Sequence, residues 1–119
     1  MVGTANWSWG MYPGLSHGAI KTLEEHGSEE QKQTWLTKVA EGEVLSCGAF
    51  TEPDHGSDIT SLNTVAEKDG NHWVINGSKI FITNAATDIT AGVTVLCRTG
   101  TREDGRPELS CILVENGTP

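Results

Sequence analysis

The feature that most constrains the fold is a change of periodicity at Gly42. Before it, apolar residues recur about every four positions, as in the run from Leu15 to Leu23, which is the spacing of one helix face. After it, short runs rich in β-branched residues alternate with turn residues, a pattern typical of strands. We therefore expect an α+β chain that is mainly β, with a helical segment at 1–42 and a β domain at 43–119.

The helical segment carries signals for two helices joined by a very short turn. The first, at 15–26, should end at Gly27, since glycine commonly follows a helix end. Ser28 and Gln31 have the spacing of a capping box, in which each side chain accepts a hydrogen bond from the other residue's backbone N–H. A second helix is thus expected at 29–41, and the two should form an antiparallel helical hairpin.

The first thirteen residues contain a cluster of large apolar side chains: Trp7, Trp9, Met11 and Tyr12. The two-residue spacing of the first three suits a strand, but the run is too short to decide its secondary structure. Side chains of this size are expected to be buried in a core or an interface.

Six short strands are expected in the β domain, at residues 44–50, 63–68, 73–75, 79–82, 93–98 and 109–115. Asn76-Gly77 lies between the third and fourth of these runs, and this pair favours a type I′ turn in a hairpin. Turn residues follow one another at intervals typical of a barrel or sandwich. The interpretation is a truncated, barrel-like domain of about six antiparallel strands.

Charge and hydropathy exclude several classes of protein. The net charge is −8, of which −6 falls on residues 43–119. Nucleic acid is therefore not an expected partner, because phosphate binding relies on clustered Lys and Arg. No apolar run approaches the length of a membrane span, and the N-terminus has no signal-peptide pattern, so a cytoplasmic protein is expected.

Three cysteines, Cys47, Cys97 and Cys111, lie in apolar surroundings without C-x-x-C spacing. This arrangement favours buried, reduced thiols over a disulfide framework or a zinc site. No metal site is expected.

The polar stretch from Thr51 to Asp58 follows the first expected strand. Pro53 fixes its own φ and favours an extended Glu52, so the chain cannot pass directly from strand to helix. The backbone freedom of Gly56 and the hydroxyl of Ser57 suit a concave nest of N–H groups that holds an anion. A plain β-turn, with Asp and Ser as turn formers, explains the same residues.

This stretch, with sequence TEPDHGSD, and the later stretch NGSKIFITN at 76–84 together resemble two signatures of the acyl-CoA dehydrogenase family. The resemblance extends over 43–119 in strand order, and the helical hairpin resembles the last helices of the family's N-terminal domain. It implies FAD-dependent α,β-dehydrogenation of acyl-CoA thioesters, with acyl-CoA as substrate partner and a homo-oligomeric assembly.

The resemblance also implies site residues. Thr51 would donate toward the pyrimidine edge of the flavin, and Thr83 would approach its N5 atom. Phe81 would pack against the flavin face, and Ser57 would lie near the pyrophosphate and the acyl-CoA. The residues expected to contact FAD are Gly48, Phe50, Thr51, Ser57, Phe81, Ile82 and Thr83.

Two departures from the family pattern affect these expectations. Gly48 stands where many relatives have an aromatic residue, and Phe50 is expected to substitute for it in part. Relatives also have a C-terminal helical domain that carries the catalytic glutamate, and nothing in this chain replaces that base. Glu52 is fixed in the turn and is expected to be structural, so no catalytic residue is assigned.

The sequence supports three hypotheses. The first is a fragment of an acyl-CoA dehydrogenase that binds FAD weakly and is inactive alone. The second is a stand-alone binding or assembly module that dimerises through the exposed edges of an incomplete barrel. The third, a small hydrolase using the acidic residues, His55 and Ser57 of the turn, lacks a G-x-S-x-G elbow.

Overall fold

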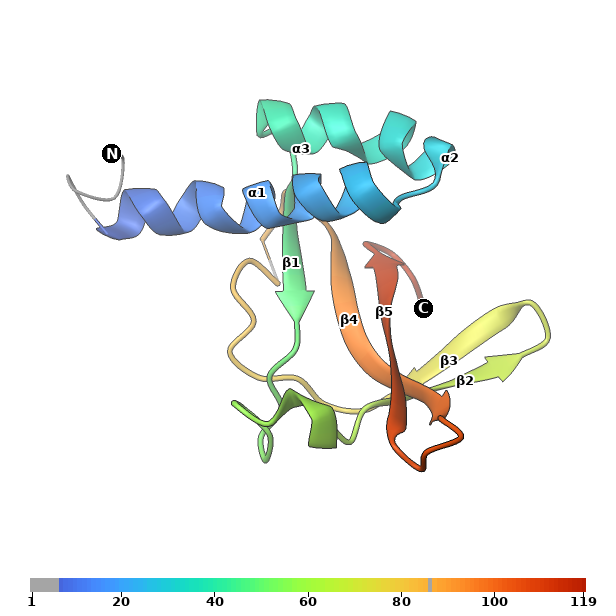
Figure 1. Cartoon of the computed structure of the whole chain (residues 1–119). Coiled ribbons are helices and arrows are strands. Elements are labelled where there is room, and N and C mark those ends of the chain that lie inside the picture. Colours follow the sequence, from blue (N-terminus) through green and yellow to red (C-terminus); the bar gives the residue numbers. More distant parts are fainter. Residues whose placement is uncertain (1–6, 86) are drawn as a thin grey trace. The chain divides into compact units, whose positions relative to one another are not determined.

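A computed structural model describes residues 7–85 and 87–119 (Figure 1). The chain divides into two compact units. The first contains Met1–Cys47 and Asn84–Gly92, and the second contains Gly48–Thr83 and Val93–Pro119.

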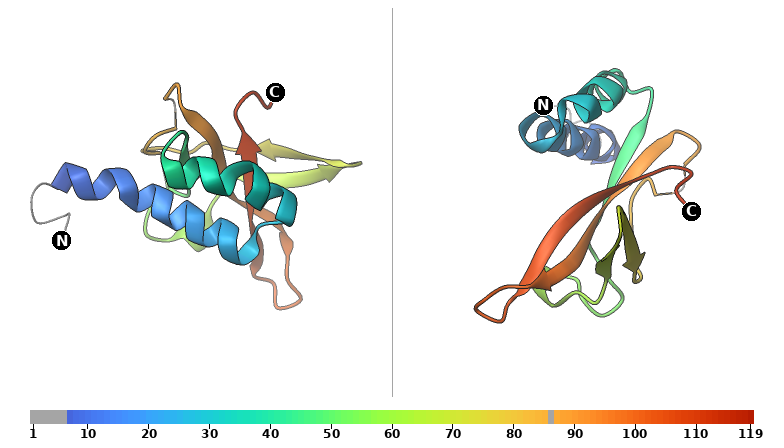
Figure 2. Two further views of the ribbon diagram at one scale, coloured as in Figure 1. Left: turned by 90° about the horizontal axis from the view of Figure 1, so that it is seen from above. Right: turned by 90° about the vertical axis from the view of Figure 1, so that its right-hand side faces the viewer.

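Helices dominate the first unit. Helix α1 spans Trp7–His26, and a second helical run follows as α2 (Glu29–Gln31), a π-helical stretch η2 (Lys32–Leu36) and α3 (Thr37–Glu41). The second run lies alongside α1, as the two views of Figure 2 show, so the predicted hairpin is confirmed.

The start of the first helix was predicted too late. The backbone from residue 7 onward is helical, and Pro13 lies in the second turn, where it removes one helical hydrogen bond without ending the helix. The predicted burial of the four large apolar side chains in this segment concerns side chains outside those that the structure describes.

The turn between the helices has the predicted capping box. The Ser28 side chain accepts a hydrogen bond from the Gln31 backbone N–H (3.2 Å), and the Gln31 side chain accepts one from the Ser28 N–H (3.0 Å). Gly42 ends the second helical run in the left-handed region at φ 75°, as glycine at this position permits. Both helix-end predictions are confirmed.

The β part of the chain is a mixed, open sheet of five strands. The strands are β1 (Leu45–Ala49), β2 (Val65–Asp69), β3 (His72–Asn76), β4 (Thr90–Thr101) and β5 (Pro107–Glu115). Their order is β1-β4-β2-β3, and β5 also pairs with β4.

The α+β class is confirmed, but the predicted barrel of six antiparallel strands is wrong. Val65 of β2 pairs with Arg98 of β4 in parallel, so the sheet is mixed, and among the described residues it does not close. Strands β2 and β3 form an antiparallel hairpin in which Asp69 pairs with His72. Gly70 occupies the left-handed region (φ 58°) at this turn.

The predicted hairpin at Asn76-Gly77 is also wrong, because residues 79–82 form no strand. Strand β3 already pairs with β2, and the chain after Gly77 runs toward the turn that begins at Thr51. Gly77 is needed for a close approach: a Cβ atom there would lie 2.3 Å from the Thr64 hydroxyl oxygen. The glycine of this pair therefore serves packing instead of a type I′ turn.

The core of the second unit is small and contains both apolar and polar side chains. Its buried apolar residues are Ala49, Leu62, Ala66, Leu96 and Cys97. Glu52 and Thr64 are buried with them. All three cysteines are free; Cys47 and Cys97 are buried as predicted, but Cys111 is exposed on β5.

Candidate functional site

The stretch from Thr51 to Asp58 forms a tight turn after β1. The Glu52 N–H donates to the His55 carbonyl oxygen (2.9 Å), and the His55 N–H donates back to the Glu52 carbonyl (3.3 Å). Gly56 is not in the left-handed region, and a Cβ atom there would meet nothing within 4 Å, so the turn does not use the freedom of that glycine.

Asp58 closes the turn. Its carboxylate accepts hydrogen bonds from the hydroxyls of Thr60 (2.7 Å) and Ser61 (2.6 Å), which lie in a short 3₁₀ helix, η3 (Ile59–Ser61). The Ser61 and Thr60 hydroxyls lower the pKa of Asp58. Asp58 is thus engaged in local turn structure.

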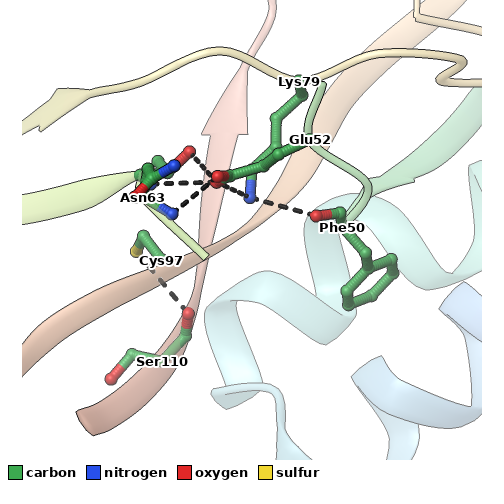
Figure 3. A network of polar contacts seen from close by, with 7 residues as sticks. Phe50, Glu52, Asn63, Lys79, Cys97 and Ser110 are labelled. Atoms are coloured by element: carbon green, nitrogen blue, oxygen red, sulfur yellow. Dashed lines mark hydrogen bonds and ion pairs between the residues drawn. The ribbon is translucent and has the colours of Figure 1, made fainter. Parts of the chain in front are cut away.

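The Glu52 carboxylate is the centre of a buried polar network, shown in Figure 3. It is 3% exposed and accepts hydrogen bonds from the backbone N–H groups of Asn63 (2.6 Å) and Thr64 (2.9 Å). The Thr64 hydroxyl also donates to it. The Lys79 ammonium completes the set at 2.9 Å from Oε1.

This environment fixes the charge of Glu52. Burial by itself raises the pKa, but the Lys79 ammonium, the Thr64 hydroxyl and two backbone N–H groups together lower it to about 2. The side chain is therefore a carboxylate at neutral pH. A carboxylate of such low basicity, with four donors around it, is a poor proton acceptor, which argues for a structural role.

Lys79 connects the two sequence motifs. Its ammonium donates to the Phe50 carbonyl oxygen (3.2 Å) as well as to Glu52. Next to it, the Ile80 N–H donates to the Thr51 carbonyl oxygen (3.0 Å). The structure thus brings together residues 50–52 and residues 79–80.

Beyond Ile80 the chain presents an aromatic side chain to solvent. Phe81 is 86% exposed, and its backbone lies in the left-handed region at φ 60°. That region is unusual for a large side chain and marks a local constraint of the backbone. Of the other expected contacts, Ser57 and Thr83 are exposed, while Thr51 and Ile82 are half-buried.

The structure also shows which side chain lies beside Gly48. A Cβ atom on Gly48 would lie 2.4 Å from a ring carbon of Phe50, so the Phe50 ring covers the position that a larger residue would occupy. Phe50 itself remains partly exposed. The expected substitution of Phe50 for an aromatic residue at position 48 is compatible with this contact.

The sequence reasoning missed the pairing of Glu52 with Lys79. The signal was present: Lys79 is a lone charge that opens an apolar run, and Glu52 is an acidic residue in a turn that has to be packed. A charge placed in an apolar run is rarely buried without a partner. The role of Thr64 carried no such signal, because it depends on tertiary contact.

The chemistry of these side chains fits a flat heteroaromatic ligand. An exposed phenyl ring can stack on such a ligand, and threonine and serine hydroxyls can form hydrogen bonds to its polar edge.

Among residues 7–85 and 87–119, no three His, Cys, Asp or Glu side chains are grouped so as to hold a metal ion. The helices of these same residues include none that is long and apolar enough to span a membrane.

Comparison with protein families gives two matches that together cover nearly the whole chain. Residues 1–43 match the N-terminal domain of the acyl-CoA dehydrogenases, and residues 47–119 match their middle domain.

Individual relatives agree. The chain is 46% identical over 89 residues to (2S)-methylsuccinyl-CoA dehydrogenase of Cereibacter sphaeroides. The aligned region covers 75% of this chain and 16% of that protein. It is 42% identical over 95 residues to the short-chain specific acyl-CoA dehydrogenase of Clostridium acetobutylicum, covering 80% of this chain and 24% of the relative.

A solved structure gives the same result. Glutaryl-CoA dehydrogenase of Mycobacterium smegmatis in complex with FADH2 superposes with a TM-score of 0.72 at 36% identity, covering 85% of this chain and 24% of that one. The chain therefore spans a quarter or less of the length of these relatives. With both domain matches and these identities, the chain belongs to the acyl-CoA dehydrogenase family.

Proposed function

We propose that this chain supplies part of the FAD- and acyl-CoA-binding surface of an acyl-CoA dehydrogenase, an oxidoreductase that forms a double bond between the α and β carbons of an acyl-CoA thioester. The observation that carries the proposal is the exposed Phe81 ring, displayed on a motif segment that is hydrogen-bonded to Thr51 through Ile80. An aromatic ring held out of the core in this way is suited to stacking.

The proposed roles follow from the resemblance of the two motifs to those of the family. Phe81, with Ile82 beside it, packs against the flavin ring, and the hydroxyls of Thr51 and Thr83 donate to its polar edge. Ser57 lies toward the pyrophosphate and the acyl-CoA. FAD, when bound, supplies the hydride acceptor, and the protein contributes position and electrostatics.

Gly48 and Phe50 complete this proposed surface. The Phe50 ring covers Gly48, so a single aromatic side chain serves a position that many relatives fill from residue 48. Support for flavin binding in the family comes from the glutaryl-CoA dehydrogenase relative, whose structure contains FADH2.

We further propose that the 119-residue chain by itself binds FAD weakly and does not turn over acyl-CoA. Glu52, the buried acid of the site, has a pKa of about 2 and cannot act as the base that removes the α-proton. Asp58, at the end of the turn, is engaged by the hydroxyls of Thr60 and Ser61.

The test is a titration of the purified chain with FAD, followed by flavin fluorescence, and an assay with acyl-CoA thioesters and a dye as electron acceptor. Weak, saturable FAD binding without turnover is the expected result. Full-affinity binding that leaves the purified protein yellow would contradict the proposed partial site, and turnover would contradict the absence of a base.

A second candidate function is assembly through the open sheet. Strand β3 is the last strand in the sheet order, and it carries the exposed Trp73 (46%) and Val74. An edge strand with exposed apolar side chains favours pairing with another chain, here a second copy. Sedimentation that shows a monomer at every concentration would count against assembly through β3.

A cytoplasmic location of the protein remains a prediction.

A further inference from the structure

We propose that Glu52 and Lys79 form a buried clasp that sets the position of residues 80–83 against the turn at Thr51. Neither residue is expected to touch flavin or substrate, so both are positioning residues. The consequence for flavin binding rests on the proposed function, but the clasp itself is a property of the polypeptide.

The first step is the geometry around Thr51. Lys79 donates to the Phe50 carbonyl on one side of Thr51 (3.2 Å) and to the Glu52 carboxylate on the other (2.9 Å). The Ile80 N–H donates to the Thr51 carbonyl between them (3.0 Å). Three hydrogen bonds therefore join two consecutive residues, 79 and 80, to three consecutive residues, 50–52.

The second step is the connection of this clasp to the sheet. Opposite Lys79, the Glu52 carboxylate accepts from the backbone of Asn63 and from Thr64. The Thr64 carbonyl in turn accepts a hydrogen bond from the N–H of Arg98 in β4 (2.9 Å). Glu52 is thus fixed from the sheet side independently of Lys79, whereas under the proposal the position of residues 80–83 depends on the clasp.

The third step concerns energy. The side chains of Lys79 and Glu52 are 11% and 2% exposed. Transfer of two charges out of water offsets most of their attraction, so a buried pair contributes little net stability compared with an apolar pair. In this chain we infer that the pair selects a single register, because an alternative packing would leave a buried charge unpaired.

The fourth step is what the clasp holds. Phe81 has a left-handed backbone conformation, at φ 60°. Such conformations persist only where the surrounding structure over-determines them. Phe81 is also exposed, so packing of its own side chain does not fix it. The contacts at Lys79 and Ile80 immediately before it are the fixed point from which the segment extends.

The experiment measures amide hydrogen exchange by NMR in the 119-residue chain without flavin, in the wild type and in Lys79→Met. Lys68→Met, an exposed lysine of β2, is the matched control. Loss of the clasp should speed exchange of the Ile80 amide by about tenfold or more, through local opening. The Arg98 amide, whose hydrogen bond is to Thr64 and not to Lys79, should be accelerated at least about tenfold less than the Ile80 amide.

Two results would overturn the proposal: an Ile80 exchange rate that does not change, or an equal acceleration of Ile80 and Arg98, which indicates global destabilisation only. Should Lys79→Met fail to fold, Lys79→Gln, which loses the charge but keeps N–H donors, is read by the same criteria. Lys79→Arg retains the ion pair and should keep Ile80 protected.

A parallel FAD titration separates this inference from the proposed function. If the wild type binds FAD, Lys79→Met should weaken binding severalfold while Lys68→Met does not. If the wild type shows no FAD binding, the proposed function fails, while the ratio of Ile80 to Arg98 exchange still decides whether the clasp exists.

Discussion

Glu52 and Phe81 belong to motifs that are hydrogen-bonded to each other, yet their side chains are at opposite extremes of exposure, 3% and 86%. The first is surrounded by donors from two other segments of the chain, and the second projects into solvent from an unusual backbone conformation. The difference separates two tasks: a buried polar centre holds the backbone, and exposed side chains are left to bind. Changes at the first should cost stability, and changes at the second should cost binding.

The largest effect is expected from Glu52→Ala. It leaves Lys79 as a buried charge without its carboxylate and removes the acceptor for the N–H groups of Asn63 and Thr64. Breaking a buried pair on one side costs about 3–5 kcal/mol, so chemical denaturation should show a loss of that size or no folded state. Glu67→Ala, at an exposed position in β2, should stay within about 0.5 kcal/mol of wild type. Equal stability of the two variants would contradict a holding role for Glu52.

Acid should weaken the same centre. The pKa of Glu52 is about 2 in the folded chain against an ordinary 4.5, so its contribution is complete above pH 4.5 and is lost as the pH falls toward 2. The free energy of unfolding that depends on this group amounts to about 3 kcal/mol. The free energy of unfolding, obtained from denaturation curves at several pH values in that range, should fall more steeply with falling pH in the wild type than in Glu52→Gln. Parallel pH dependence of the two proteins would show that Glu52 has no lowered pKa.

A smaller effect is expected from Gly77→Ala, which tests the close approach of the second motif. The added methyl would lie 2.3 Å from the hydroxyl oxygen of Thr64, a partner of Glu52. Overpacking of this kind costs about 1–3 kcal/mol, measurable by thermal or chemical unfolding. Gly56→Ala is the control, because its methyl group meets nothing within 4 Å. A destabilisation equal to that of Gly56→Ala would show that the contact does not constrain the chain.

The smallest effect on stability is expected at the displayed side chain. Phe81 is exposed, so Phe81→Ala should change the free energy of unfolding by no more than about 0.5 kcal/mol. The same variant should weaken FAD binding, since an aromatic stacking partner is lost. Trp73→Ala, a second exposed aromatic residue, should leave binding unchanged. Equal FAD affinity for Phe81→Ala and the wild type would remove Phe81 from the proposed site.

Local signals predicted the helical part of the chain well. The capping box at Ser28 and the left-handed Gly42 depend on residues three or four positions apart, and both are present as predicted. The start of α1 was missed because Pro13 and several glycines weaken the helical pattern there. Where the determining contacts are short-range, periodicity and end signals are sufficient.

The sheet could be predicted only in part, because its pairing is set by contacts distant in sequence. Five of the six predicted strands lie close to observed ones, and residues 79–82 form none, while the parallel pairing of Val65 with Arg98 has no local signal. Asn76-Gly77 was misleading for the same reason: its glycine lies against Thr64, a residue distant in sequence, and Lys79 pairs with Glu52 instead of continuing a hairpin. The motif residues proposed for the site come from the sequence, whereas the buried pair that joins the motifs required the structure.

The central claim is that residues near Thr51 and Phe81 form one flavin-binding surface. The most direct measurement is an NMR titration of the ¹⁵N-labelled 119-residue chain with FAD up to millimolar concentration. Amide shifts should concentrate at residues 48–57 and 80–83 and should diminish in Phe81→Ala but not in Trp73→Ala. Shifts confined to the helix α1 or to β3, or no shift in either motif, would contradict the claim.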